Sequence, residues 1–391
     1  MRKAATTMDY AKILMDLISI DTTVPPGRNY AQAIDYLTPL FQGAGFKTQS
    51  VVIPPEEAEG REGRVNLVAH RRSPGKQRLI FYCHVDVVPA EGWNAFTPRL
   101  ADGRIYGRGA ADMKGGIVAL LQGLDAVKDR PINYDVSAII TTDEEYSQAT
   151  QLRYLARFLE PVDGSYVFCL DASFGFVAVT GLGLVQLDIR VKGKSVHSGL
   201  SHMGENAVEK AVPLMEALLK LKRRVTRRKS KIAVHPETGL KTMVPRLNIN
   251  VVQGGIKTNI VPDSCLISVD RRLIPEENVE EAEKEIMDAL RSVPGVQWEI
   301  EKAFRIPTVS PVQCPVVDKL ERIIREVTGQ SGQFGEMGSG DLSSIVANDW
   351  KGMDFGLGVI RSDNNIHGKD EFVYQKDVED AGKIVARFLV S

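Results

Sequence analysis

His84 and Asp86 are two residues whose types and spacing could hold a metal ion. They come at the end of an apolar run, Leu79-Ile-Phe-Tyr, which predicts a buried strand. Side chains alternate across a strand, so residues two apart point to the same face. One of the two could therefore bind a metal ion, while the other fixes the tautomer of the imidazole through a hydrogen bond.

Asp112 and the pair Glu144 and Glu145 add carboxylates at comparable places. Asp112 comes after a glycine-rich loop and before a predicted helix, and the pair follows a strand predicted for residues 136–141. Open α/β sheets place their sites at the carboxyl ends of strands, so these side chains could reach the end of the His84 strand. Taken singly, Asp112 could be a helix N-cap, and the glutamates could be solvated loop carboxylates.

Asp171 and His367 complete the set of candidate ligands. Asp171 ends a strand predicted for residues 166–170, and His367 lies in a polar loop. Two imidazoles and several carboxylates suit Zn²⁺, with Co²⁺ or Mn²⁺ as possible substitutes. One ion needs three protein ligands and an open position, whereas five ligands indicate two ions and a bridging carboxylate. One of the paired glutamates would then bind metal, and the other would remain free as a general base.

Helices and strands alternate in the first part of the chain, which predicts a sheet that is largely parallel at its centre. Predicted helices cover residues 10–18, 30–41, 113–127 and 152–159, and predicted strands cover residues 48–53, 65–70, 79–84, 136–141 and 166–170, with a short hairpin between residues 93 and 108. The same character returns after Pro307, with helices predicted for residues 316–327, 343–347 and 378–389 and a short strand for residues 356–360.

A different order of elements lies between these two parts. Strands are predicted for residues 185–192, 247–252, 265–271 and 297–301, and helices for residues 206–221 and 279–290. This β-α-β-β-α-β order is that of the ferredoxin-like unit. We therefore predict a two-domain α/β protein, in which residues 1–181 and 304–391 form one domain and residues 182–303 form an inserted α+β domain.

Composition excludes several classes of partner. The chain has 391 residues and a formal net charge of −1, which gives no overall field to recruit nucleic acid or an anionic membrane. No apolar run has the length of a membrane span, and residues 1–8 lack the apolar core of a signal peptide. Four scattered cysteines show no C-x-x-C spacing, which favours a reducing cytoplasm over a disulfide framework.

Taken together, the motifs resemble a family of zinc amidohydrolases and exopeptidases that includes aminoacylase, acetylornithine deacetylase, succinyl-diaminopimelate desuccinylase, glutamate carboxypeptidase and carnosinase. The resemblance rests on His-x-Asp at residues 84–86, Gly-Arg-Gly-Ala-Ala-Asp-Met-Lys-Gly at residues 107–115, the Glu-Glu pair, His-Ser-Gly at residues 197–199 and the late His367. It implies a zinc-exopeptidase-type mixed sheet with helices on both faces. It also implies that the inserted ferredoxin-like domain serves as a lid and dimerisation domain.

The resemblance also implies a set of five metal ligands. His84 and Asp171 would complete the site of one ion, and Glu145 and His367 would complete the site of a second ion. Asp112 would bridge the two ions. One or two Zn²⁺ ions per subunit are therefore expected.

Catalytic roles are implied for three further residues. Glu144, the first glutamate of the pair, matches the general base of the family. Asp86 matches the residue that orients the metal-binding histidine. His197 matches a histidine that reaches into the partner subunit's site and polarises the scissile carbonyl, which implies a homodimer.

Four residues match segments that bind the substrate in this family. Asn259 and Arg272 match an asparagine and an arginine that hold the substrate carboxylate, which a planar guanidinium grips with two hydrogen bonds. Arg271 is the alternative to Arg272, and the position of the motif favours Arg272. Ser339 and Gly340 lie in a Gly-Ser-Gly-Asp segment that resembles the glycine-rich substrate loop, although it departs from the commoner Gly-Gly-x-Asp.

We therefore expect a cytoplasmic homodimer that hydrolyses the amide bond of a small N-acyl amino acid, as acetylornithine deacetylase or succinyl-diaminopimelate desuccinylase does. A dipeptidase or carboxypeptidase of the same family is the alternative. Two interpretations of other classes are a non-catalytic metal-binding or regulatory protein on this fold and a scaffold with structural zinc. The carboxylate-rich ligand set differs from the closed Cys/His shells of structural zinc.

Overall fold

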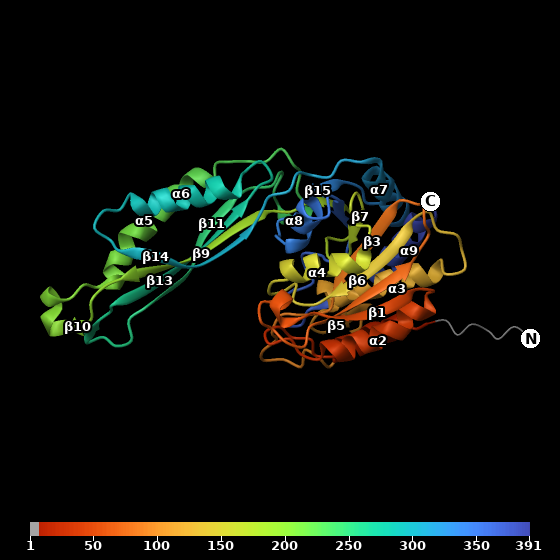
Figure 1. The fold of residues 1–391 in the computed structure, drawn as a ribbon, viewed down its shortest axis with the longest axis horizontal. Helices are drawn as coiled ribbons and strands as arrows, with labels where there is room; N and C mark the ends of the chain where they lie inside the picture. The colour runs from red at the N-terminus through yellow and green to blue at the C-terminus, as the bar shows by residue number, and fades with distance from the viewer. Residues whose placement is uncertain (1–7) are drawn as a thin grey trace, which may run out of the picture. The chain divides into compact units, whose positions relative to one another are not determined.

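A computed structural model describes residues 8–391 of the chain (Figure 1). The absence of a signal peptide was predicted from residues 1–8, of which residues 1–7 lie outside the described residues. The chain divides into two compact units. Unit 1 comprises Met1–Val179, Val312–Phe334 and Asp341–Ser391, and unit 2 comprises Thr180–Pro311 and Gly335–Gly340. The boundaries 182–303 predicted for the inserted domain stay a prediction. Unit 2 also contains residues 180–181, 304–311 and 335–340.

Unit 1 is organised by one mixed sheet of eight strands. Its order is β1 (Lys47–Val52), β2 (Val65–Arg71), β6 (Asp135–Thr141), β3 (Arg78–His84), β7 (Tyr166–Cys169), β16 (Met353–Gly356), β8 (Val177–Thr180) and β15 (Gln333–Gly335). β3 is parallel to both β6 and β7, and β16 is parallel to β7. The prediction of a sheet with a parallel centre is therefore confirmed.

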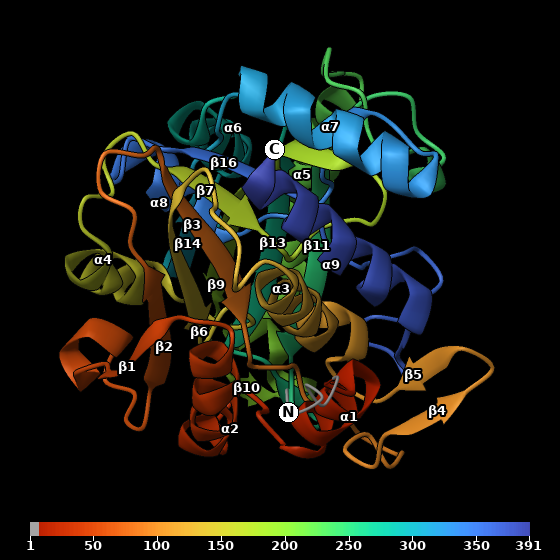
Figure 2. The same cartoon turned by 90° about the vertical axis from the view of Figure 1, so that its right-hand side faces the viewer.

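Helices cover both faces of this sheet because β3 buries alternate residues in two different layers. Phe81 and Cys83 pack in one core with α2 (Tyr30–Gly43), α3 (Gly115–Ala126), α7 (Pro315–Thr328) and α9 (Gln375–Val390). Ile80 and Tyr82 pack in the other core with α4 (Ala149–Leu159) and α8 (Asp341–Asn348). Figure 2 shows α3 and α9 side by side, and α1 (Tyr10–Ser19) packs against α3. The predicted α/β class is confirmed.

Unit 2 is a four-stranded antiparallel sheet covered by two helices. The strand order is β11 (Arg246–Gly254), β13 (Ser264–Leu273), β9 (Gly183–Lys192) and β14 (Trp298–Ile306). The helices α5 (Ala207–Val225) and α6 (Val279–Arg291) bury one face of this sheet in a separate core. α5 runs without interruption through Pro213. The chain order of these elements is the β-α-β-β-α-β order read from the sequence.

Shorter elements complete the described chain. They are β4 (Arg99–Ala101), β5 (Arg104–Tyr106) and β17 (Phe372–Tyr374) in a three-stranded sheet, β10 (Val196–His197) paired with β12 (Ile260–Val261), and the short helical turns η1 (Pro55–Ala58), η2 (Ala110–Lys114), η3 (Ser198–Met203) and η4 (Pro236–Thr238). None of the helices in residues 8–391 has the length and the apolar character needed to cross a bilayer.

Several predicted boundaries are wrong by two or more residues, among them those of one strand and one helix of unit 1. The strand predicted for residues 356–360 lies earlier, as β16; beyond it the chain passes close to the Ala172 backbone at Gly358 and is joined to that segment by the isolated bridge between Ser173 and Ile360. The helix predicted from Met113 begins at Gly115, because Asp112 and Met113 have non-helical backbone angles.

Candidate metal centre

Three neighbouring parallel strands deliver the candidate ligands to one edge of the sheet. His84 is the last residue of β3, Glu145 follows β6, and Asp171 follows β7. Because β3 lies between β6 and β7 and is parallel to both, these three strand ends meet at the same edge. The extended backbone of Asp112, at the turn before α3, brings a fourth side chain to this edge.

Asp112 lies between two histidines. Its Oδ1 is 3.3 Å from His84 Nε2, and its Oδ2 is 3.1 Å from His367 Nε2. His84 Nε2 is also 3.6 Å from Asp171 Oδ2, and His367 Nε2 is 3.1 Å from Glu145 Oε1. The five predicted ligands therefore form two groups that share Asp112.

The two groups fit divalent metal ions. The ligand atoms of His84, Asp112 and Asp171 lie within 4.8 Å of one another, as do those of Asp112, Glu145 and His367. Among the described residues, His84 Nε2 and Asp112 Oδ1 are buried without a hydrogen-bond partner. Buried polar atoms are normally paired, so these atoms indicate that a further group binds between them. Imidazole and carboxylate donors are the ligands that Zn²⁺ and related ions prefer.

Glu144 lies beside the ligands without belonging to either group. Its Oε2 is 4.0 Å from His84 Nε2. Burial raises the pKa of Glu144 well above its ordinary value, the positive charge of His84 opposes this shift, and the carboxylates of Asp171, Glu145 and Asp112 add to it. A carboxylate that accepts a proton readily and is not used as a ligand has the properties of a general base.

The electrostatics of the second group follow from its hydrogen bonds. His367 forms hydrogen bonds with Asp112 and Glu145, and these bonds raise the pKa of His367 to about 10. Burial and the charge of Asp112 raise the pKa of Glu145 to about 7. Burial favours the neutral acid at Asp112 as well, but its hydrogen bond with His367 and the nearby positive charge of His84 outweigh this effect and lower its pKa.

Asp86 is buried beside His84, but its nearest contact with the imidazole is through its main chain. His84 Nδ1 lies 3.1 Å from the Asp86 carbonyl oxygen and 3.5 Å from Asp86 Oδ1. Asp86 Oδ2 accepts a hydrogen bond of 3.0 Å from the Glu145 backbone N–H. Asp86 therefore links the His84 strand to the loop that carries Glu145.

Sequence reasoning missed the role of Asp143, which precedes the two glutamates. Its carboxylate is fully buried and accepts hydrogen bonds from Tyr30 Oη (2.9 Å), Arg61 Nε (2.9 Å), Arg64 Nε (2.8 Å) and Gln151 Nε2 (3.0 Å). These partners fix the loop that presents Glu144. The acidic run Asp-Glu-Glu was visible, but its arginine partners lie about 80 residues earlier and follow no local pattern.

In unit 2, two predicted substrate-binding residues lie together. Arg272 Nη1 donates a 3.0 Å hydrogen bond to Ser339 Oγ, and the Arg272 side chain is 30% exposed. The neighbouring Arg271 side chain is 0% exposed and forms an ion pair with Glu277. Arg272 is therefore the arginine of this pair that a ligand could reach. Gly340 follows Ser339 directly.

The other two predicted residues of unit 2, His197 and Asn259, form a second cluster. Ser198 N donates a 3.0 Å hydrogen bond to the Asn259 carbonyl, beside the pairing of β10 with β12. Both side chains are exposed, and His197 Nδ1 accepts a hydrogen bond from Gly199 N. This cluster lies at the end of β13 that begins at Ser264, whereas Arg272 lies near its other end, roughly 26 Å along the strand.

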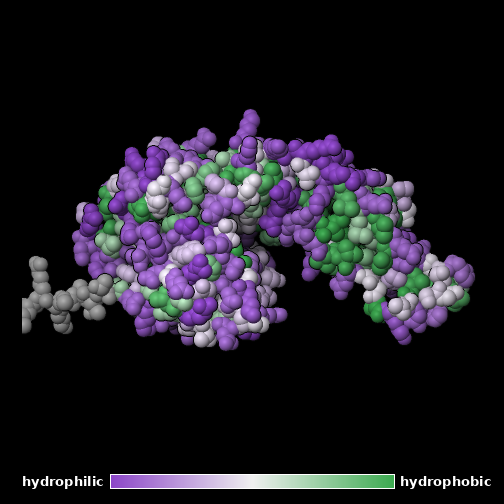
Figure 3. All heavy atoms as spheres, turned by 180° about the vertical axis from the view of Figure 1, so that it is seen from behind, coloured by the Kyte–Doolittle hydropathy of each residue, from purple (hydrophilic) through white to green (hydrophobic). Residues whose placement is uncertain are grey.

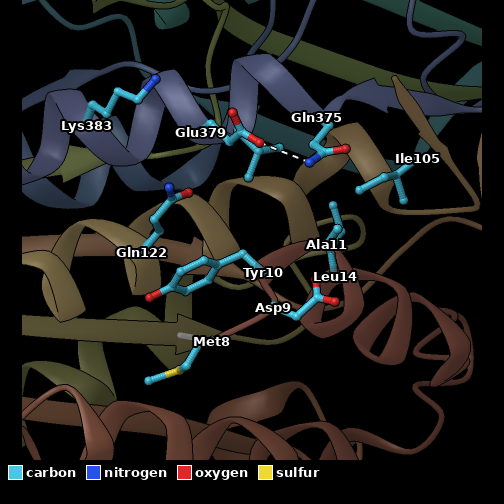
Figure 4. A pocket seen from close by; sticks show the side chains of 11 residues that line it. Met8, Asp9, Tyr10, Ala11, Leu14, Ile105, Gln122, Gln375, Glu379 and Lys383 are labelled. Atoms are coloured by element: carbon cyan, nitrogen blue, oxygen red, sulfur yellow. Dashed lines mark hydrogen bonds between the residues drawn. The ribbon is translucent and has the colours of Figure 1, made fainter. Parts of the chain in front are cut away.

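A cavity of about 270 Å³ in unit 1 is separate from these residues (Figure 4). Tyr10, Gln122, Glu379 and Lys383 are among the residues that line it, from α1, α3 and α9. None of the predicted site residues lines this cavity. This cavity therefore gives no information about the candidate metal centre, which is identified by the positions of its ligand atoms.

Comparisons with known proteins find enzymes that this chain resembles in sequence or in fold. The succinyl-diaminopimelate desuccinylase of Delftia acidovorans is 25% identical over 390 residues, which cover 95% of each chain. The acetylornithine deacetylase of Vibrio campbellii is 28% identical over 287 residues, which cover 72% of this chain and 71% of that protein. An M20 family metallo-carboxypeptidase from Sulfolobus solfataricus shares the fold with a TM-score of 0.77, at 17% identity and with 98% of each chain covered.

The family itself is established by a match over most of the sequence. Residues 80–391 match the family model for peptidase family M20/M25/M40. This stretch begins within β3 and contains all the candidate ligands. The chain therefore belongs to peptidase family M20/M25/M40 and is a metal-dependent hydrolase.

Proposed function

We propose that this protein hydrolyses the amide bond of a small N-acyl amino acid, as a desuccinylase or deacetylase. The observation that carries the proposal is the position of Asp112 between two imidazoles, with Glu144 close by and outside both ligand groups. The similarity to a succinyl-diaminopimelate desuccinylase and an acetylornithine deacetylase supports the deacylase class.

The residues of the centre would divide the reaction among them. His84, Asp112 and Asp171 would hold one Zn²⁺, and Asp112, Glu145 and His367 a second, with Co²⁺ or Mn²⁺ as substitutes. When bound, such an ion acts as a Lewis acid that acidifies a water molecule and polarises a carbonyl. Glu144 takes a proton from the attacking water as its oxygen bonds to the amide carbon. Glu144 then returns the proton to the amine nitrogen as the C–N bond breaks.

Arg272 would bind the carboxylate of the substrate. Its guanidinium is partly exposed, and Asp270 and Ser339 hold it in place with hydrogen bonds of 3.0 Å each. A planar guanidinium can donate two parallel hydrogen bonds to a carboxylate, whereas an ammonium group cannot reproduce that geometry. We also assign the substrate contacts of the Gly-Ser-Gly-Asp loop to Ser339 and Gly340.

His197 and Asn259 would act in the site of a second subunit of a homodimer. Within unit 2 they lie at the opposite end of β13 from Arg272, so one copy of unit 2 does not bring the two clusters together. In an antiparallel arrangement of two copies, the His197 cluster of one could lie beside the Arg272 cluster of the other. His197 would then stabilise the oxyanion of the transition state, and Asn259 would contact the substrate carboxylate.

Exposed apolar side chains on unit 2 support this dimer. Val212 and Leu219 on α5 are each 45% exposed, and Val251 and Val252 on β11 are 44% and 51% exposed. β11 is an edge strand and packs beside α5, so its free backbone groups could pair with a second copy. Figure 3 shows apolar residues gathered on one face of unit 2.

Dipeptide hydrolysis is the second candidate function. The structural likeness to a metallo-carboxypeptidase supports only the shared fold. A dipeptide presents a free α-amine next to the scissile amide, which calls for an acidic partner, whereas an acyl chain does not. The two candidates therefore differ in the charge that they require on the acyl side of the amide.

A competition assay tests the proposal. The protein is stripped of metal, reloaded with Zn²⁺, Co²⁺ or Mn²⁺, and given an equimolar pool of N-succinyl amino acids, N-acetyl amino acids and dipeptides, with mass-spectrometric readout. We expect metal-dependent loss of N-acyl amino acids, with the metal-free protein as control. Preferential loss of dipeptides would contradict deacylase activity and indicate a dipeptidase instead.

A further inference from the structure

A buried ion pair lies behind the shared ligand Asp112. Arg108 Nη1 donates a 2.6 Å hydrogen bond to Glu371 Oε2, and both side chains are almost fully buried. Glu371 Oε1 accepts hydrogen bonds from the backbone N–H groups of Ala111 (3.1 Å) and Asp112 (3.3 Å). Glu371 therefore holds the backbone of the segment that carries Asp112, whereas His84 and His367 contact the Asp112 side chain.

Glu371 also anchors the loop that carries His367. It lies four residues after His367, and its own carbonyl accepts a 2.9 Å hydrogen bond from Gly107 N. Phe372 N donates to the Asn364 carbonyl (3.1 Å), which closes the loop between residues 364 and 372 at its base. One residue thus connects the two segments that bring Asp112 and His367 together.

His84 and Asp171 are held in a different way. His84 is the last residue of the central strand β3, and Asp171 follows the neighbouring strand β7, so the sheet itself fixes both. Asp112 and His367 instead lie in irregular segments, where His367 has a left-handed backbone conformation with φ 60°. The separation of Asp112 and His367 therefore depends on side-chain contacts between their segments.

From these contacts we infer that Glu371, held by Arg108, is a positioning residue that sets the distance between Asp112 and His367. It thereby raises the affinity of the centre for the second metal ion, the one expected between Asp112, Glu145 and His367. The inference rests on the proposed two-ion centre. Residues that orient metal ligands from outside typically change metal affinity 10- to 100-fold when they are substituted. The loss should fall mainly on the Asp112, Glu145 and His367 group, because the sheet continues to hold His84 and Asp171.

Calorimetric titration of Zn²⁺ into the metal-free protein tests the inference without relying on turnover. Glu371→Gln keeps the size of the side chain but sets an amide against Arg108. We expect one Zn²⁺ to bind at least about tenfold more weakly in this variant and the other to bind within threefold of the wild-type affinity. In a His367→Ala background, Glu371→Gln should weaken binding at the remaining site by no more than about threefold, because two of its three ligands, His84 and Asp171, lie at strand ends.

Asp135→Asn is the matched control. Asp135 is a buried carboxylate that accepts hydrogen bonds from Arg72 Nε and Ser73 N, but it begins β6, at the opposite end of that strand from Glu145. This variant should bind both ions as the wild type does, even if it unfolds at a lower temperature.

Two results would overturn the inference. One is wild-type affinity for both ions in folded Glu371→Gln, and the other is an equal loss at both sites. If Glu371→Gln does not fold, Arg108→Lys replaces it, because lysine keeps the charge and loses the planar contact; the same asymmetric loss is then required. A wild-type protein that binds two ions but hydrolyses no amide would contradict the proposed function and leave the role of Glu371 standing.

Discussion

At the residue scale, the proposed base depends on its neighbour in the chain. Asp143 has a left-handed backbone conformation with φ 65° and receives hydrogen bonds from two arginines, Tyr30 and Gln151. A buried carboxylate with this many donors is fixed in direction as well as charge. Its backbone conformation turns the chain between β6 and Glu144, so the network behind the centre determines where the base points.

Asp143→Asn should therefore destabilise the protein. Asparagine tolerates the left-handed conformation of residue 143. The substitution therefore removes the negative charge opposite Arg61 and Arg64 without adding backbone strain. Removing one partner of a buried ion pair costs about 3 kcal/mol. Chemical denaturation should show a fall of that size in the free energy of unfolding, while the exposed Asp129→Asn should change it by less than about 0.5 kcal/mol. Equal effects of the two substitutions would refute this role for Asp143.

At the element scale, the strands could be predicted better than the turns that place the side chains. Leu79-Ile-Phe-Tyr is a continuous apolar run, which is the pattern of a strand buried on both faces, and Val136 and residues 138–140 give the strand before Asp143 a mainly apolar character. Their strand ends, and hence the edge that carries His84 and Glu145, followed from the sequence. The extended backbone of Asp112 and the closure of the His367 loop by Glu371 did not, because they depend on contacts between segments about 260 residues apart.

The strand β16 carries a buried carboxyl whose titration gives a prediction. Burial raises the pKa of Asp354 to about 6, and a hydrogen bond from Ser343 opposes this shift. Between the unfolded value of 3.8 and about 6, the folded protein binds more protons, so this group makes stability fall as pH rises. Above pH 6 the penalty is fully present.

Asp354→Asn should remove this penalty. Its free energy of unfolding relative to the wild type should increase by about 2 kcal/mol between pH 4 and pH 7. Urea denaturation of both proteins at the two pH values measures the change. A difference that stays constant with pH would show that Asp354 is ionised at little cost in the folded protein.

At the scale of the whole molecule, the proposed role of His197 requires two copies of the chain. The inserted unit was visible in the sequence as a change in the order of elements, and the structure adds the exposed residues on α5 and β11. No pattern in the sequence distinguishes exposed Leu219 and Val251 from the buried apolar residues of the same elements, because both kinds occur in amphipathic runs.

Charges on this surface should separate the subunits. Leu219→Lys with Val251→Lys is expected to convert a dimer into a monomer in sedimentation velocity, with metal content unchanged and turnover reduced at least about tenfold, because His197 would no longer reach a second site. Val52→Lys, on the exposed edge strand β1 of unit 1, is the matched control and should leave the dimer intact. A fully active wild-type monomer would exclude a role for His197 in a partner's site.

In the proposed mechanism, Glu144 is the proton-transferring base beside a metal centre to which it contributes no ligand. The most direct measurement compares Zn²⁺-loaded wild type and Glu144→Ala for metal content and for turnover of the N-acyl amino acid that the wild type prefers. If Glu144 is the base, the variant should bind as much metal as the wild type and turn over about 10²- to 10⁴-fold more slowly. Turnover near that of the wild type in the metal-loaded variant would contradict this role of Glu144, and loss of bound metal would instead identify Glu144 as a ligand.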